Sequence, residues 1–425
     1  MINEENFIFE KPVRDGINTP NNRIEAKLND YFYEIDLSGK VYFKTKCQLF
    51  RLSNFDITFR KDCLYGMLNN NGEVNILPKY GAILSAFGNN HYSFCMPDNK
   101  YKFGLIDRKG NIKVPAIYDG CLDYIGKDYY VCVIGEYDGL IDENGNQILP
   151  CEYYDSSIHF WNRKKDYFTA CKGDKYGVVD KNNNIIIPFE YNYICRCFNK
   201  GKYKDCSVLE YDGAEGIIND KNEIVVPFEY SEIRVLSDKT FFVSKKDNPD
   251  KCFIVDNNFN KIRDVNFNFI IDQKDITGNY FIAGIEPDGN DGLIDKYGNI
   301  KIDLKYSDLR MIYGPNKEEI YLYAQNEYGK YGIIDIEENV IVPFEYEHSF
   351  CEINNDYTAI MVKNGKYGVI NIKTNEVLVD FIYEDIYLYN NRETALAKYD
   401  GKWGIINKYG QSIKYDFLNV KELTI

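Results

Sequence analysis

The hydrophobic pattern of this chain repeats a two-strand phrase, of which residues 175–191 (KYGVVDKNNNIIIPFEY) are the clearest copy. A first apolar run opens on an aromatic residue and a glycine and ends at Asp180, and a second run ends at Tyr191. Two short apolar runs separated by polar turn residues predict two antiparallel strands. Aligned on the glycine or its replacement, the phrase recurs every 33 to 40 residues, which is the length of one supersecondary unit. The opening glycines are Gly66, Gly104, Gly139, Gly177, Gly216, Gly292, Gly332, Gly368 and Gly404.

An Asp or Asn follows each opening position by three residues, and a Gly or Asn often follows three residues later. Asp and Asn side chains accept hydrogen bonds from backbone amides two residues ahead, so the pair predicts a tight turn that closes a hairpin. A ladder of calcium sites is the alternative, and it is disfavoured because several copies are Asn and no D-x-D-x-D-G run occurs. These residues are Asn69, Asp107, Asp142, Asp180, Asn219, Asp256, Asp295, Asp335, Asn371 and Asn407.

The second strand of most copies carries a proline and, shortly after it, an aromatic residue. Proline cannot donate a ladder hydrogen bond, so the pattern predicts that it marks the end of the strand. One large ring per repeat predicts a packing layer between neighbouring repeats. The prolines are Pro78, Pro115, Pro150, Pro188, Pro227 and Pro343, and the rings are Tyr80, Tyr118, Tyr153, Tyr191, Tyr230, Phe267, Tyr306, Tyr346 and Tyr383.

A further strand precedes the phrase. Asn364-Gly365, Asp400-Gly401 and Gly173-Asp174 each separate two apolar runs, which indicates two-residue hairpin turns. Residues 383–389 (YEDIYLY) indicate a fourth short strand. We therefore expect an all-β fold of tandem repeats of about 37 residues, each a three- to four-stranded antiparallel meander. Such units bury their faces by stacking as propeller-like blades, in a double ring or an open β superhelix.

The repeats suggest three regions. Residues 1–30 are polar and poorly patterned, and we expect an irregular cap there. Residues 31–250 and 251–425 form a first and a second array of repeats, with a boundary near the degenerate copy at 244–270, in which Phe253 replaces the glycine.

Composition narrows the possible partners and the location. The 425 residues carry a formal net charge of −14, which disfavours binding to nucleic acid. The first residues lack the basic segment of a signal peptide, and no apolar run approaches the roughly 20 residues that span a bilayer. We expect a cytoplasmic protein that does not bind membranes. Its twelve cysteines are scattered, as reduced core residues would be, and a metal at Cys195 and Cys197 is the less favoured alternative.

The repeat resembles the WG-repeat (KWG) family of bacterial proteins over roughly residues 30–420. The resemblance rests on Lys402-Trp403-Gly404-Ile405-Ile406-Asn407 and on variants such as Lys366-Tyr367-Gly368, Lys330-Tyr331-Gly332, Lys175-Tyr176-Gly177 and Lys102-Phe103-Gly104. Trp403 alone keeps the tryptophan of the family name. The resemblance implies a β-repeat scaffold with a binding role, and it supplies no catalytic residues.

No combination of residues indicates catalysis. His91, His159 and His348 occupy different phases of the repeat, and the chain has no HExxH, GxSxG, P-loop or GxGxxG motif. The recurring carboxylates Glu152, Glu190, Glu229 and Glu345 serve every repeat alike, whereas catalysis needs one asymmetric pair. We expect no enzymatic activity, no cofactor and no metal.

Segments that break the repeat are the better functional candidates, because irregular loops of repeat scaffolds often make the binding face. Residues 160–165 (FWNRKK) and 193–204 (YICRCFNKGKYK) are basic-aromatic clusters in an acidic chain. We expect a protein partner to bind there; the alternative is a glycan or small ligand in a Tyr-rich groove, and an enzyme is a third option. The candidate partner-binding residues are Trp161, Arg163, Lys164, Arg196 and Tyr203.

Overall fold

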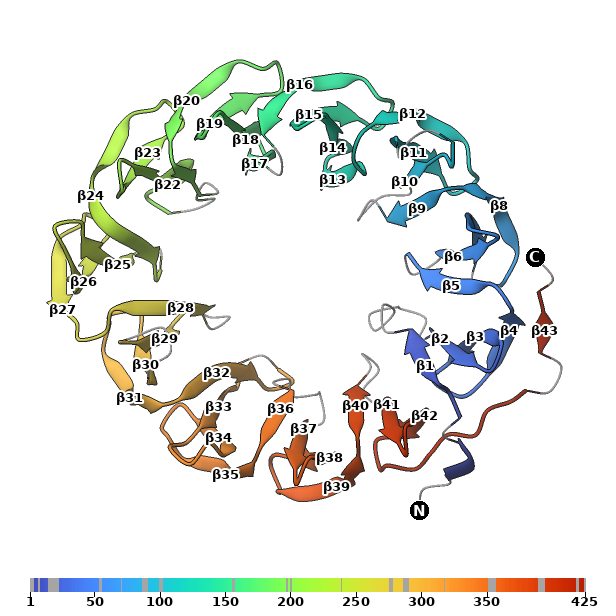
Figure 1. The fold of residues 1–425 in the computed structure, drawn as a ribbon. Coiled ribbons are helices and arrows are strands. Elements are labelled where there is room, and N and C mark those ends of the chain that lie inside the picture. The colour runs from blue at the N-terminus through green and yellow to red at the C-terminus, as the bar shows by residue number, and fades with distance from the viewer. Residues whose placement is uncertain are drawn as a thin grey trace. The chain divides into compact units, whose positions relative to one another are not determined.

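The computed structural model describes residues 4–6, 8–13, 23–52, 56–69, 71–85, 91–98, 102–154, 157–195, 198, 201–237, 239–274, 278–285, 290–316, 318–350, 357–388, 394–417 and 420–423. The regular elements of these residues are β strands, apart from a short 3-10 turn at Glu4–Asn6 (Figure 1). The chain forms two compact units. The first unit comprises Phe9–Asn199, Tyr203–Pro227 and Tyr415–Ile425, and the second comprises Met1–Ile8, Lys200–Lys202 and Phe228–Lys414.

One sheet of the first unit shows the construction of a repeat. Its strands β17 (His159–Asn162), β18 (Tyr167–Lys172), β19 (Lys175–Asp180) and β20 (Ile185–Tyr191) pair antiparallel in chain order. The two-strand phrase of the sequence corresponds to the last two strands, and the two strands before it complete a meander.

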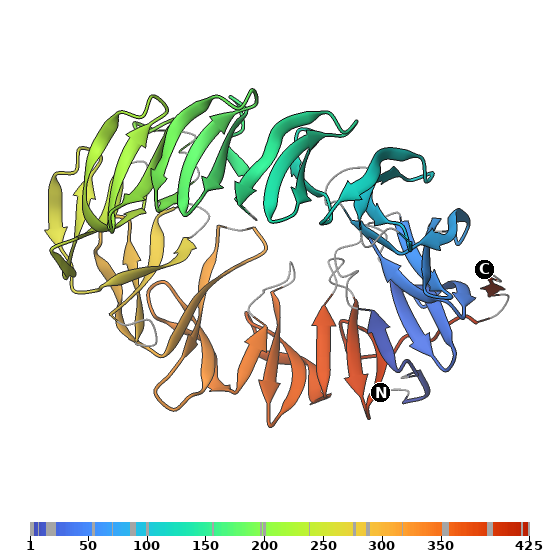
Figure 2. The same cartoon turned by 45° about the horizontal axis from the view of Figure 1, so that its top comes forward.

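The same meander recurs along the first unit, and sheets that follow each other in the chain lie side by side in Figure 1 and Figure 2. Its other strands are β1 (Lys11–Val13), β2 (Arg23–Leu28), β3 (Tyr31–Asp36), β4 (Val41–Thr45) and β43 (Lys421–Glu422); β5 (Gln48–Arg51), β6 (Asp56–Lys61), β7 (Leu64–Asn69) and β8 (Val74–Tyr80); β9 (Ala82–Ser85), β10 (His91–Cys95), β11 (Phe103–Asp107) and β12 (Ile112–Tyr118); β13 (Asp123–Gly126), β14 (Tyr129–Ile134), β15 (Tyr137–Asp142) and β16 (Gln147–Tyr154); and β21 (Tyr193–Ile194), β22 (Cys206–Tyr211) and β23 (Ala214–Asn219). Strands β1 and β2 lie within residues 1–30, where the sequence predicted a cap.

The second unit is built in the same way, and β24 (Ile224–Val235) carries the chain from the first unit into it. Its strands are β25 (Thr240–Lys245), β26 (Asn248–Asp256) and β27 (Lys261–Asp264); β28 (Phe269–Lys274), β29 (Tyr280–Gly284), β30 (Asp291–Asp295) and β31 (Ile300–Tyr306); β32 (Asp308–Tyr313), β33 (Ile320–Gln325), β34 (Tyr331–Asp335) and β35 (Val340–Tyr346); β36 (His348–Phe350), β37 (Thr358–Lys363), β38 (Lys366–Asn371) and β39 (Glu376–Tyr383); and β40 (Asp385–Leu388), β41 (Thr394–Tyr399) and β42 (Lys402–Asn407).

The opening glycine allows the last strand of the repeat to bulge against it. In β11 and β12, Phe103 pairs with Tyr118 but Leu105 pairs with Val114, so three residues of β12 face Gly104 alone. A Cβ atom on Gly104 would lie 2.3 Å from the carbonyl oxygen of Val114. Similar register shifts and close approaches occur at Gly66, Gly139, Gly177, Gly292, Gly332 and Gly368.

This bulge corrects the predicted place of the proline. Pro115 lies inside β12, opposite Gly104, and not at the end of the strand. A bulged residue is left out of the regular ladder, so a proline there forfeits no hydrogen bond. The prediction assumed a regular ladder and was wrong for that reason.

The Asx turn is confirmed. Oδ1 of Asp180 accepts hydrogen bonds from the backbone N–H groups of Asn182 and Asn184, both at 2.8 Å, and Oδ2 accepts one from the Asn184 side chain at 2.9 Å. Asn183 takes the positive φ of 65° that the turn requires. Equivalent bonds to the backbone occur at Asn69, Asp107, Asp142, Asn219, Asp256, Asp295, Asp335 and Asn407. The side-chain oxygens of these Asp and Asn residues thus stabilise the turn.

The aromatic residue that ends each repeat packs against the next repeat, as predicted. The Tyr191 ring is buried, and its hydroxyl donates to Oδ1 of Asn222 in the following turn at 3.0 Å. Tyr306 reaches Glu338 in the same way at 2.8 Å. Between these contacts, consecutive sheets share a core, such as the cluster of Leu140, Leu149, Tyr153, Ile158, Phe160, Phe168, Ala170 and Val179 between sheets β13–β16 and β17–β20.

The predicted hairpins are also confirmed. Asn364 and Gly365 have φ values of 54° and 68°, and Asp400 and Gly401 have 47° and 74°, as two-residue turns require. The strand expected at residues 383–389 is β40, which pairs with β41 and so opens the next sheet.

The fold class is therefore confirmed as all-β tandem repeats of antiparallel meanders. The double ring or superhelix and the two predicted arrays, 31–250 and 251–425, stay predictions. Among the residues described above, none forms a helix long and apolar enough to cross a membrane.

Candidate binding site

The first unit contains a cavity of about 830 Å³ at the end of neighbouring sheets. We call it the basic pocket, and its described lining residues are Ile125, Lys127, His159, Phe160, Trp161, Asn162, Arg163, Lys164, Lys204 and Asp205.

Three equivalent turns of successive repeats form the basic pocket. Lys127 lies in the turn between β13 and β14, residues 163–166 connect β17 to β18, and Lys204 and Asp205 precede β22. Each turn joins the first strand of a sheet to the second. Because these sheets follow one another in the chain, the three turns reach the same end of the first unit.

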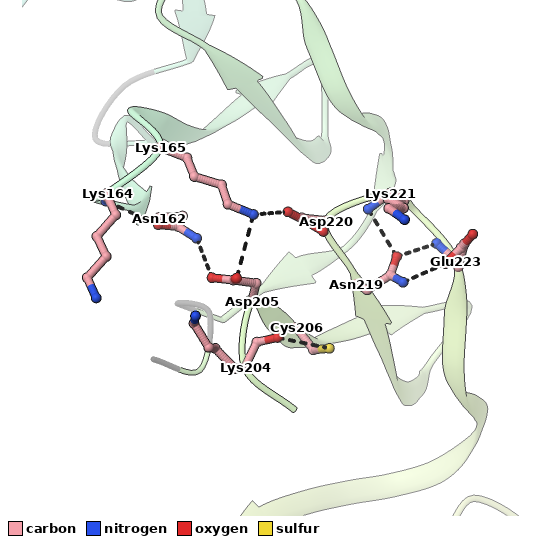
Figure 3. Close-up of polar contacts among 10 residues, drawn as sticks. All are labelled: Asn162, Lys164, Lys165, Lys204, Asp205, Cys206, Asn219, Asp220, Lys221 and Glu223. Carbon is pink, nitrogen blue, oxygen red and sulfur yellow. Dashed lines mark hydrogen bonds and ion pairs between the residues drawn. The ribbon is translucent and has the colours of Figure 1, made fainter. Parts of the chain in front are cut away.

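A polar network fixes the central turn (Figure 3). The Asn162 side chain accepts a hydrogen bond from the Lys164 backbone N–H at 3.1 Å and donates one to Asp205 at 2.8 Å. Lys165 forms ion pairs with Asp220 and, at 3.6 Å, with Asp205. Its hydrogen bond to Asp220 raises the pKa of Lys165. Lys165 is therefore occupied in joining two repeats.

Three cations that line the pocket differ from Lys165 in their pairing. Arg163, Lys164 and Lys204 form no ion pair with any residue that the structure describes. Figure 3 shows Lys164 extending away from the Lys165–Asp220 pair. With Lys127, which pairs with Asp166 at 2.5 Å, they make four cations among the described lining residues, where the single carboxylate is that of Asp205. The pocket is thus positive in a chain whose net charge is −14.

Arg163 is held in place by apolar and backbone groups. Its guanidinium carbon lies 5.3 Å from the centre of the Phe160 ring, which is within the range of a cation–π contact. Its terminal nitrogen packs against Gly126 so closely that a Cβ there would lie 1.7 Å from it. Arg163 is therefore positioned before any ligand arrives.

Trp161 forms part of the wall. It is 1 % exposed, and its ring stacks on Tyr167 with a centroid distance of 6.4 Å. Its indole Nε1 is buried and has no hydrogen-bond partner among the described residues. A buried donor without an acceptor costs about 1–3 kcal/mol, so it calls for an acceptor.

The structure brings together three of the five residues that the sequence singled out. Trp161, Arg163 and Lys164 line one pocket, although Trp161 belongs to the wall and not to an exposed loop. Tyr203 is buried near Phe198, with ring centroids 6.4 Å apart, while its neighbour Lys204 lines the pocket. Arg196 lies outside the described residues.

Sequence reasoning missed Lys127 and Asp205 as members of the site, and it included Lys204 only within the cluster at residues 193–204, without singling it out. Their common signal is position: all follow the first strand of a repeat and precede the second. That signal becomes usable only once the short first strands are assigned, and these strands are the weakest part of the repeat pattern.

The described residues contain no group of three His, Cys, Asp or Glu side chains that could hold a metal ion. His159 lines the basic pocket, whereas His91 lies elsewhere and its Nδ1 is 3.1 Å from the Tyr130 hydroxyl. The ten cysteines among the described residues form no disulfide bond with one another. The sulfur atoms of Cys132 and Cys151 are 3.7 Å apart.

Comparisons with known proteins agree with the repeat. The family model described as a WG containing repeat matches residues 103–131, 139–176, 176–204, 216–248, 331–367 and 367–403. No curated protein matches the chain. Similar solved structures include a eukaryotic initiation factor (10 % identity, TM-score 0.43, covering 74 % of this chain and 92 % of that one), Kluyveromyces lactis Hsv2 (10 %, 0.28, 57 % and 94 %) and the tricorn protease (9 %, 0.30, 91 % and 51 %). Similarities this low carry no argument about function.

Proposed function

We propose that this chain, a member of the WG-repeat family, is a non-enzymatic scaffold that binds a protein partner at the basic pocket. The observation that carries the proposal is that three cations without an ion-pair partner among the described residues gather in one cavity of an otherwise acidic protein. Arginine, here the exposed Arg163, is among the side chains enriched at interface hot spots.

The location of the pocket supports this function. Residues that keep the repeat are used in turns, bulges and inter-repeat contacts, so they are not free to act on a ligand. The basic pocket is made instead by turns whose length changes from one repeat to the next, from two residues between β13 and β14 to four between β17 and β18. Loops that vary on a regular scaffold are where such proteins place recognition.

The repeated carboxylates favour a structural role. Glu152 pairs with Lys172 at 3.4 Å, and Glu345 pairs with Lys363 at 3.1 Å. Glu229 pairs with Lys245. Each pair joins the strand that ends one repeat (β16, β35 or β24) to the second strand of the next repeat (β18, β37 or β25). This recurrence supports a scaffold without enzymatic activity.

The alternative function, a glycan or small ligand in a Tyr-rich groove, gains little from the repeated tyrosines. Tyr80, Tyr153, Tyr191 and Tyr383 are buried between sheets, where their rings are not available to stack on a sugar. The large aromatic side chains among the described lining residues, Phe160 and Trp161, are buried as well. A protein partner is therefore the better match.

Site-specific crosslinking in the full chain tests the proposal. A photo-crosslinking amino acid replaces His159, which is exposed at the pocket, or Lys172, at the other end of β18. We expect a partner to crosslink from position 159 and not from 172, and to be lost in a variant with Arg163→Glu and Lys164→Glu. A partner that crosslinks equally from 172, or survives the charge reversal, contradicts the proposal. Deleting residues 160–165 is not a suitable test, because Phe160 and Trp161 are buried.

A further inference from the structure

We propose that the partner presents an extended acidic segment, whose carboxylates bind Arg163, Lys164 and Lys204 in the basic pocket. This inference rests on the proposed function and specifies the chemistry of the ligand.

The distribution of charge around the basic pocket favours an acidic ligand. Arg163, Lys164 and Lys204 come from two successive turns and have no ion-pair partner among the described residues, while Lys165 between them is neutralised by Asp205 and Asp220. Neighbouring unpaired cations repel one another, and an anion placed among them removes that repulsion. The rest of the chain is acidic, so it repels an acidic segment and directs it to this pocket.

Arg163 is preorganised for binding a carboxylate. Its guanidinium lies over Phe160 and against the backbone of Gly126, so a single geometry is favoured before binding. A fixed, planar guanidinium can bind a carboxylate through two parallel hydrogen bonds. Little conformational entropy is then lost when the acidic group docks.

The wall of the pocket also offers hydrogen-bonding groups to a ligand. Trp161 Nε1 is a buried donor that lacks an acceptor among the described residues. In the described part of the chain, β17, which carries Trp161, is the edge strand of its sheet and pairs with β18. An edge strand offers backbone donors and acceptors to an extended peptide. A peptide supplies both carboxylates and backbone carbonyls, which is why we favour it over a simple phosphate ion or a nucleic acid.

The test uses the full chain and labelled peptides of eight residues, octaglutamate and octaglutamine, with binding followed by fluorescence anisotropy. We expect octaglutamate to bind, with an affinity that falls as the sodium chloride concentration rises from about 50 to 300 mM. We expect octaglutamine not to bind. Arg163→Gln and Lys204→Gln should each weaken octaglutamate binding by about tenfold. The matched control Lys172→Gln removes a lysine at the other end of β18 and should leave binding within about twofold. Circular dichroism verifies that each variant is folded.

Several outcomes overturn the acidic segment. They are equal binding of the two peptides, an equal effect of Lys172→Gln, or displacement of octaglutamate by inorganic phosphate or an eight-nucleotide oligothymidine at lower concentration than by unlabelled peptide. The two proposals fail separately. A partner that crosslinks at position 159 but resists excess octaglutamate overturns the acidic segment and leaves the proposed function. If octaglutamate binds but no partner depends on the pocket, the proposed function is overturned and the binding of an acidic segment stands.

Discussion

The hydroxyl of Tyr191 donates a hydrogen bond to Oδ1 of Asn222, 3.0 Å away, and so ties the last strand of one repeat to the turn of the next. Asn222 is the turn residue with a φ of 60°, so the bond also holds the conformation that the turn needs. The repeats are thus joined by a polar contact in addition to the buried ring.

Tyr191→Phe should remove this tie and keep the ring. We expect the unfolding free energy to fall by about 1 kcal/mol, the net value of a hydrogen bond whose acceptor can turn to water. Backbone amides of residues 219–223 should exchange with solvent faster, as hydrogen-exchange mass spectrometry can measure. The control is Tyr328→Phe, at an exposed tyrosine, which should change neither quantity.

Gly104→Ala should destabilise the first unit strongly. The new Cβ would lie 2.3 Å from the carbonyl oxygen of Val114, so the bulge of β12 must move. We expect a loss of about 3 kcal/mol, at the upper end for overpacking because backbone and not a side chain must shift. Gly81→Ala meets the Cys95 sulfur at 3.2 Å and should cost clearly less. Equal urea midpoints for the two variants would contradict this account of the glycine.

Two equivalent Asx turns contain the same carboxylate–amide pair with the positions of the two groups exchanged. Asp180 faces the Asn184 side chain, whereas the equivalent turn pairs Asn219 with Glu223 at 2.7 Å. Asn184→Glu alone places two carboxylates together and should cost about 1 kcal/mol. Adding Asp180→Asn recreates the Asn–Glu pair and should restore the thermal midpoint. A double variant no more stable than the single one would show that the two positions are not coupled.

Much of the repeat was predictable because its signals are local. Asp180 and Asn183 specify their turn from within five residues, and Asn364-Gly365 specifies its hairpin in the same way. Pro115 was misplaced because its position depends on Gly104 in the neighbouring strand.

The basic pocket was predictable only in part for a similar reason. Arg163 and Lys164 stand out as a basic cluster, but Lys127 and Lys204 join them only because consecutive sheets, whose equivalent turns are about 40 residues apart in the chain, lie side by side. The burial of Trp161 likewise follows from its place in β17, which the irregular sequence of the segment concealed.

Asp291 should make stability depend on pH. Burial raises the pKa of Asp291 to about 6 from an ordinary value of 3.8, and nearby Asp308 adds to this, although a hydrogen bond from the Leu309 backbone opposes it. Between these pH values the folded protein binds more protons than the unfolded chain, so the unfolding free energy falls as pH rises. Asp291→Asn should therefore stabilise the protein at pH 7.5, by up to about 3 kcal/mol, and give no gain at pH 3. Asp303→Asn, on the same repeat but exposed, is the control for urea unfolding at both pH values.

Leu423 should stabilise sheets whose residues are remote from it in the sequence. β43 pairs in parallel with β4, and Leu423 packs in a cluster with Phe43, Leu49, Ile57, Phe59 and Leu68. Leu423→Ala should lower the unfolding free energy of the first unit by about 2 to 4 kcal/mol, because it leaves a cavity beside Phe43. Amides of β4 and β6 should lose protection from hydrogen exchange. Leu77→Ala, at a leucine that is 69 % exposed, should change neither quantity. If both variants behave alike, Leu423 makes no specific contribution to the core of this unit.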